Sequence, residues 1–140
     1  MKGKINDKIE EIEEYLSDLN EIRPDSFEDY ENSKEERAAC EHYFEKIVEA
    51  VEDLAFLVVK DRKIKVDDEN KIFDIIADNG VIKGELALKL KDAKGMRNII
   101  AHEYGEVDDE VVFEAIQNEI EMDVREFLEN IKKLEEDVGE

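Results

Sequence analysis

The residues best suited to chemistry lie in one stretch of ten, residues 95–104, which read GMRNIIAHEY. The stretch holds one of the two histidines and one of the five arginines of the chain. On a helix, Arg97 and Tyr104 lie on nearly the same side, while Asn98 and His102 share a neighbouring side. The four side chains therefore form one polar patch near the C-terminal end of a predicted helix.

This set of side chains suits cleavage of RNA without a metal ion. Such a reaction needs a base for the proton of the 2′-hydroxyl, a cation for the charged phosphorane and an acid for the leaving oxygen. An imidazole such as that of His102 can perform either proton transfer. The guanidinium of Arg97 keeps its charge and matches phosphate oxygens in pairs. One histidine cannot be acid and base in the same step, but two copies of His102 brought together across a dimer axis can fill both roles.

A purely structural interpretation of the same residues stays open from spacing alone. Cations near the C-terminal end of a helix interact favourably with the helix dipole, so Arg97 and His102 also fit a role as helix-end partners. Glu49 and Asp53, four residues apart on another predicted helix, either contact Arg97 and support it or face water. Helical spacing does not decide between these alternatives.

The elements that must position the patch are helices. Apolar residues recur at steps of three and four in three long segments, and each segment has one apolar face: residues 5–19, 40–58 and 113–134. Ser33 and Asp108 are predicted to cap helices, Asn79-Gly80 and Gly105 to end them, and residues 20–30, with Pro24, to form a connecting loop. The sequence predicts an all-α fold, a four- to five-helix up-and-down bundle in a single domain of residues 1–140.

Composition limits the classes of protein further. Cys40 is the only cysteine, so a disulfide within the chain and a zinc site of cysteines are excluded, and it is expected to be buried. His42 is expected to be exposed. The longest apolar run, residues 54–59, is too short to span a membrane, and the charged N-terminus lacks the apolar stretch of a signal peptide. We therefore expect a cytoplasmic protein that does not associate with membranes.

The net charge of −21 is unusual for a protein that binds nucleic acid. Phosphate backbones are bound mainly by Lys and Arg, so the overall field of this chain repels RNA. Binding of RNA therefore requires a local concentration of basic residues, or a partner protein that supplies one.

The spacing of Arg97, His102 and Tyr104, with Asn98 directly after the arginine, resembles the Arg-x4-His-x-Tyr motif of HepT-type toxins, which are HEPN proteins. The resemblance covers roughly residues 5–135. It includes the acidic pair of the second long helix and two segments on either side of the motif: Glu49 with Asp53, residues 79–90 and Val107-Asp108.

The resemblance implies a HEPN-like helical homodimer, paired through the helix that carries the motif, and a metal-independent endoribonuclease that needs no cofactor. Arg97 and His102 are its catalytic residues, and Asn98 and Tyr104 support substrate binding. The toxins of this kind are encoded beside an MntA-like nucleotidyltransferase antitoxin. That enzyme neutralises the toxin by AMPylation of the motif tyrosine, here Tyr104.

Two alternatives remain from the sequence. The first is a catalytically inactive HEPN dimer that serves as binding partner or substrate of a nucleotidyltransferase. The second is a purely structural helical dimer. The presence of Tyr104 favours the toxin or the inactive partner over a structural role.

Overall fold

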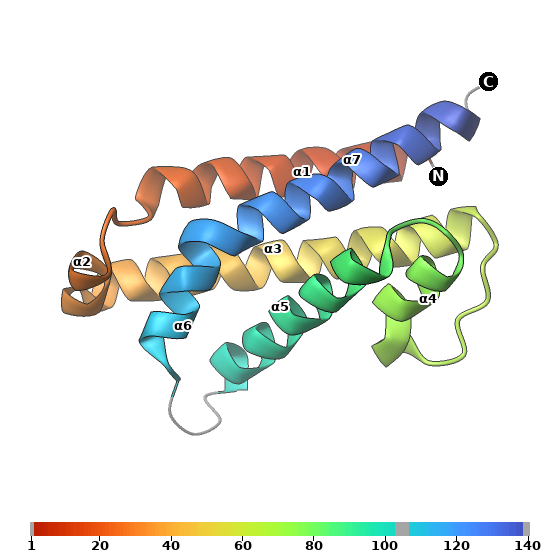
Figure 1. Cartoon of the computed structure of the whole chain (residues 1–140). Helices are drawn as coiled ribbons and strands as arrows, with labels where there is room; N and C mark the ends of the chain where they lie inside the picture. Colours follow the sequence, from red (N-terminus) through yellow and green to blue (C-terminus); the bar gives the residue numbers. More distant parts are fainter. Residues whose placement is uncertain (1, 103–106, 139–140) are drawn as a thin grey trace.

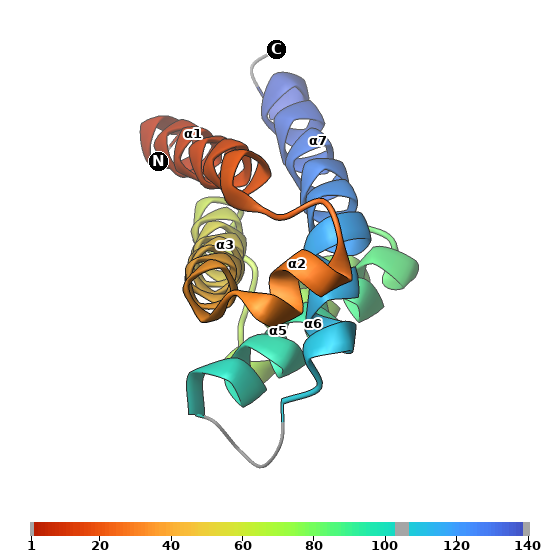
Figure 2. The same cartoon turned by 90° about the vertical axis from the view of Figure 1, so that its left-hand side faces the viewer.

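The computed structural model describes residues 2–102 and 107–138, and the side chains among them up to residue 136. Its four longest helices run in alternating directions, as predicted for an up-and-down bundle (Figure 1): α1(Lys2–Ile22), α3(Lys34–Asp61), α5(Gly84–His102) and α7(Ile120–Val138). Seen along the bundle, α1 and α7 form one layer and α3 and α5 the other (Figure 2). None of the described helices is long and apolar enough to cross a membrane.

Short elements close the two ends of the bundle. At one end α2(Phe27–Asn32) connects α1 to α3. At the other end η1(Glu69–Lys71) and α4(Ile72–Asp78) lie between α3 and α5. A further helix, α6(Asp109–Glu114), continues through the π-helical segment η2(Ala115–Glu119) into α7.

The predicted loop at residues 20–30 is wrong at both of its ends. Helix α1 continues to Ile22, and α2 begins at Phe27. The Ser26 hydroxyl caps α2 by accepting a hydrogen bond from the Asp29 backbone N–H at 3.2 Å. The ring of Phe27 packs against that of Phe113, with centroids 5.8 Å apart. A local cap and a contact with a distant helix therefore stabilise a short helix where the sequence contains turn-forming residues.

The other predicted helix ends are confirmed where the structure describes them. The Ser33 hydroxyl accepts from the Glu36 N–H, and the Asp108 carboxylate accepts from the N–H groups of the first turn of α6. Gly80 follows α4 with a φ of +78°, the left-handed conformation expected of a glycine that ends a helix. The predicted end at Gly105 lies outside the described residues.

The predicted apolar stripes form a large part of the core, which also includes Tyr30 and buried residues of α4 and α5. The α1 stripe, Ile5 to Leu19, and the α3 stripe, Cys40 to Val58, are buried along their whole length. Burial contributes about 1.5–3 kcal/mol for each large apolar side chain. Cys40 is fully buried, as predicted, and burial raises the pKa of its thiol to about 11. His42 is exposed, also as predicted.

Helix α5 differs from the other long helices because one of its faces is apolar and yet uncovered. Its inner face packs into the core through Leu86, Ala87 and Leu90. On the outer face Leu88 is 58% exposed and Ile99 is 45% exposed. Gly95 lies between them on the same face, so α5 presents a shallow apolar surface to solvent in the single chain.

Candidate active site

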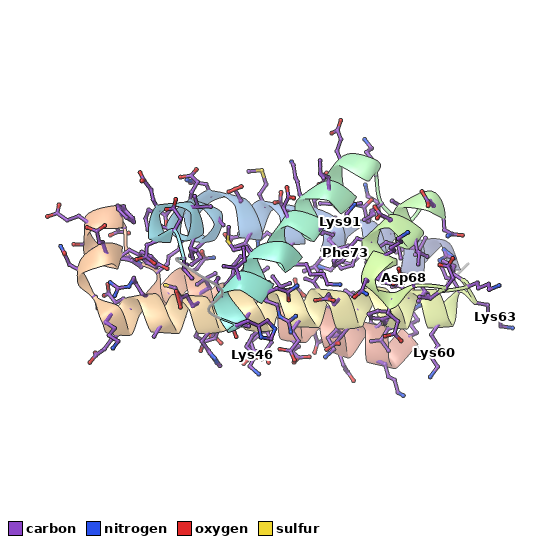
Figure 3. The ribbon with its side chains drawn as sticks, turned by 90° about the horizontal axis from the view of Figure 1, so that it is seen from below. Lys46, Lys60, Lys63, Asp68, Phe73 and Lys91 are labelled. Atoms are coloured by element: carbon purple, nitrogen blue, oxygen red, sulfur yellow. The ribbon has the colours of Figure 1, made fainter. Side chains whose placement is uncertain are left out.

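Helix α5 positions the residues of the motif. The helix is continuous through Gly95 and ends at His102. Figure 3 shows α5 crossing α3, and the labelled Lys46 of α3 lies near the C-terminal end of α5. The motif residues therefore lie where the last turns of α5 cross the middle of α3, and Arg97 pairs with Glu52 there. Tyr104 falls outside the described residues.

Arg97 lies on the side of α5 that faces α3 and is held there by two groups. Its Nη1 donates a hydrogen bond to Oδ1 of Asn98 at 3.2 Å. The same nitrogen lies 3.8 Å from Oε1 of Glu52, which belongs to α3. The Arg97 side chain is 28% exposed, so its guanidinium remains accessible to a ligand.

Glu52 is shared between two cations. Its Oε2 lies 3.4 Å from Nζ of Lys94, one turn before Arg97 on α5, while its Oε1 faces Arg97. The Glu52 side chain is only 15% exposed. The carboxylate therefore bridges Lys94 and Arg97 in a partly buried cluster with a net charge of +1.

Glu49 and Asp53 face water and do not contact Arg97, which is the second of the two alternatives that the sequence left open. Both are exposed, and Oδ2 of Asp53 lies 3.6 Å from Nζ of Lys8 on α1 rather than near Arg97. The carboxylate beside Arg97 is that of Glu52, which the sequence analysis did not single out. A signal was present, because Glu52 shares a helix face with Val48 and Val59, both buried.

His102 is the last residue of α5 and is exposed. At about 100° per residue, its position is roughly 140° around the helix from that of Arg97, and Asn98 lies between them. His102 shares the outer face of α5 with Gly95 and Ile99. A single chain thus directs its guanidinium towards α3 and carries its histidine on the exposed apolar face.

A groove borders this face. It runs between α5 and α6 and is lined by both apolar and polar groups, among them Ile99, Ile100, Val111 and Val112. Val111 is 51% exposed, so the apolar surface continues from α5 onto α6. Among the described residues, no group of three or more His, Cys, Asp or Glu side chains is arranged to hold a metal ion.

Basic residues are more frequent in the part of the sequence that leads up to the motif than elsewhere in the chain. Residues 60–97 contain ten of the 20 basic residues but only eight of the 41 acidic ones. Helix α5 alone carries Lys89, Lys91, Lys94 and Arg97. Six of these ten basic residues precede α5, and Lys60 and Lys63 lie at the end of α3 opposite the C-terminal end of α5 (Figure 3). Close to the site, the basic groups are those of Lys94 and Arg97, and a phosphate backbone must bind through them.

Comparison with protein families gives one match that spans most of the chain. The model of a family described as "Ribonuclease HepT-like" matches residues 5–131. Among curated relatives, a tRNA nuclease HepT of Aphanizomenon flos-aquae is 29% identical over 115 residues, which are 80% of this chain and 77% of the relative. A putative RNase of Archaeoglobus fulgidus is also 29% identical, over 91 residues that are 65% of this chain and 68% of that protein.

Solved structures share the fold at lower sequence identity. A tri-AMPylated HEPN toxin of Shewanella oneidensis, in complex with an MNT antitoxin, superposes with a TM-score of 0.85 at 23% identity. The match covers 92% of this chain and 96% of that one. A toxin–antitoxin complex with AMP-PNP gives a TM-score of 0.84 at 22% identity, with 92% and 97% of the two chains covered. The all-α fold is therefore that of known HEPN toxins.

Proposed function

Because the chain belongs to the HepT-like ribonuclease family, we propose that it is the toxin of a cytoplasmic toxin–antitoxin pair and cleaves RNA without a metal ion. The observation that carries the proposal is the state of Arg97. Its Nη1 is occupied by Asn98 and Glu52, while Nε and Nη2 have no hydrogen-bond partner among the described residues. A phosphate can therefore bind to these two nitrogens as a bidentate pair.

Two copies of His102 supply the proton transfers. One neutral imidazole takes the proton of the 2′-hydroxyl while the 2′-oxygen forms a bond to phosphorus. The bond from phosphorus to the 5′-oxygen breaks, and that oxygen takes a proton from the second imidazole, which is protonated. The products are a 2′,3′-cyclic phosphate and a 5′-hydroxyl. Arg97 stabilises the charge on the phosphorane between these steps.

The second His102 comes from a homodimer built on the outer face of α5. Leu88 and Ile99 leave apolar surface on this face, and no atom lies within 4 Å of a Cβ placed on Gly95. A second helix can therefore approach closely at Gly95. Since His102 lies on the same face, the two-fold axis of such a dimer brings the two histidines to one side of the assembly.

The antitoxin is a nucleotidyltransferase that transfers AMP from ATP to Tyr104. The structurally similar Shewanella oneidensis toxin is AMPylated and bound to its MNT antitoxin, which supports the same regulation here. Each AMP group attached two residues after His102 adds a negative phosphodiester close to the site. The modified tyrosine then competes with substrate phosphate for Arg97.

The test is cleavage of tRNA and mRNA by the purified protein and its variants. We expect Arg97→Ala and His102→Ala each to lower the rate of cleavage by at least about 100-fold, because each removes a group that stabilises the transition state or transfers a proton in it. Circular dichroism should show the same helix content, since both side chains are accessible to solvent.

The chain offers matched controls for both variants. Arg125→Ala removes an exposed arginine whose one ion pair among the described residues is with Glu121 on α7, and His42→Ala removes the other histidine. Both controls should cleave RNA at the wild-type rate. Full activity in Arg97→Ala or His102→Ala would remove that residue from the mechanism. A wild-type protein that is AMPylated but cleaves no RNA would be an inactive HEPN partner instead.

A further inference from the structure

Glu52 occupies an unexpected place for an acidic residue in a site that binds phosphate. It is partly buried on α3, and its two carboxylate oxygens face two different cations of α5, Lys94 and Arg97. A carboxylate next to the phosphate-binding arginine weakens phosphate binding by repulsion. Its presence in this site therefore requires a compensating role. The contacts of the guanidinium indicate what that role is.

The guanidinium is held at one corner only. Nη1 hydrogen-bonds Asn98 and faces Glu52 at 3.8 Å, a separation too long for a hydrogen bond but short enough for an ion pair. Rotation about the terminal bonds of an arginine side chain otherwise carries its nitrogens through many directions. Fixing Nη1 between an amide oxygen and a carboxylate leaves the edge formed by Nε and Nη2 directed away from α3.

We propose that Glu52 is a positioning residue of the ribonuclease, which holds Arg97 so that its Nε–Nη2 edge meets the scissile phosphate. The inference rests on the proposed function. Glu52 does not touch the substrate and transfers no proton. It acts through Arg97, and it is one of the reasons that Arg97 can bind in a bidentate manner without reorganising during the reaction.

Lys94 has the complementary role of balancing the charge of Glu52. Without Lys94, Arg97 and Glu52 would form a neutral pair, and an approaching phosphate would gain little from the site. With Lys94, the cluster keeps a net charge of +1 in a chain whose net charge is −21. The bridge therefore combines a fixed guanidinium with a positive local field.

These roles predict opposite kinetic effects for the two residues. Glu52→Gln keeps the shape of the side chain and releases both cations, so we expect kcat to fall about 10-fold while KM stays equal or falls. Lys94→Met leaves Glu52 uncompensated beside Arg97, so we expect KM to rise about 10-fold with little change in kcat. Glu52→Asp keeps the charge and should recover part of the lost kcat.

Salt dependence separates positioning from a merely structural role. Binding of a fluorescein-labelled U20 RNA is measured in a His102→Ala background, in which cleavage does not interfere. In that background Glu52→Gln should make the plot of log Kd against log salt steeper by about 0.7 for each additional phosphate that a protomer binds. A residue that only stabilises the fold would change the midpoint of unfolding and leave this slope unchanged.

Glu49→Gln is the matched control. Glu49 lies three residues earlier on the same helix and is exposed, so its substitution changes the net charge by the same amount without touching the bridge. The control should keep the wild-type kcat and the wild-type salt slope. An equal effect of both substitutions would overturn the proposal, because it would show a general effect of charge.

The remaining outcomes are also decisive. A wild-type kcat in Glu52→Gln rejects the positioning role, whereas the proposed function stands if Arg97→Ala still abolishes cleavage. If Glu52→Gln does not fold, the test rests on Lys94→Met, and an unchanged KM in that variant rejects the bridge. Unchanged cleavage in Arg97→Ala would instead remove Arg97 from the mechanism and the positioning role with it, whereas a wild-type protein that cleaves no RNA would reject the proposed function itself.

Discussion

Tyr104 is the residue through which the proposed toxin would be regulated. It follows His102 by two residues, and Arg97 precedes it by seven, which places it near the guanidinium in sequence. Co-expression with the partner nucleotidyltransferase, in the presence of ATP and Mg²⁺, should add one or more AMP units to this chain and suppress RNA cleavage. Intact-mass analysis followed by peptide mapping measures both the number of units and their position.

Two variants decide whether Tyr104 is the acceptor. Tyr104→Phe lacks the hydroxyl and should gain no AMP mass, while Tyr43→Phe, which changes a partly buried tyrosine of α3 in the same way, should be modified like the wild type. A Tyr104→Phe protein that is neutralised as well as the wild type, with no adenylate mass in either, would show that the antitoxin acts by occlusion alone.

At the level of residues, the sequence identified the motif but not the partner of its arginine. The types and spacing of Arg97, Asn98 and His102 were sufficient to place them together at the end of one helix. Which carboxylate of α3 faces Arg97 depends on the angle and offset at which two helices cross, and helical periodicity does not contain that information. For this reason the sequence pattern indicates Glu49 and Asp53 as possible partners of Arg97, whereas the contact is formed by Glu52, one residue before Asp53.

Among the elements, the turn between α4 and α5 depends on one glycine. Gly80 has a φ of +78°, a conformation that costs an L-residue with a Cβ roughly 1–2 kcal/mol. We therefore expect Gly80→Ala to lower the free energy of unfolding by about that amount, measured by urea denaturation at a fixed protein concentration.

Gly84→Ala provides the comparison for this effect. Gly84 begins α5, its φ is not in the left-handed region, and a Cβ placed on it has no atom within 4 Å. The same chemical change should therefore alter the free energy of unfolding by less than about 0.5 kcal/mol. Equal losses in the two variants would mean that the conformation of Gly80 does not limit the stability of this turn.

The elements that the sequence missed depend on contacts between distant parts of the chain. The predicted long helix after Asp108 is interrupted by the π-helical segment η2, and the carbonyl of Gln117 in this segment accepts a hydrogen bond from Nη1 of Arg23 at 3.5 Å. Arg23 follows the end of α1, 94 residues earlier. Apolar spacing reports which face of a helix is buried, but it does not report such a bond or the widened turn beside it.

In the molecule as a whole, acidic residues are distributed unevenly along the chain. Outside residues 60–97 the chain carries 33 of its 41 acidic residues. This majority repels RNA, so productive binding depends on the cations of α5 close to the motif, Lys94 and Arg97. We infer that the acidic remainder keeps the unbound toxin from binding nucleic acids indiscriminately, while the site itself stays positive.

The whole-molecule prediction is a dimer whose contact is centred on Gly95. In the single chain a Cβ at this position meets no atom within 4 Å, and glutamine is a much better helix former than glycine. Gly95→Gln should therefore leave the fold of each chain intact and fill the space that a partner helix needs. Sedimentation velocity at micromolar concentration should give about twice 16.3 kDa for the wild type and the mass of a single chain for the variant.

RNA cleavage should be lost together with the dimer, because the proposed reaction needs two copies of His102. Gly3→Gln, an equivalent change on α1 with no atom within 4 Å of a Cβ, should remain dimeric and active. A Gly95→Gln protein that stays dimeric would move the interface away from this face of α5, and a monomeric, active wild type would eliminate the composite site.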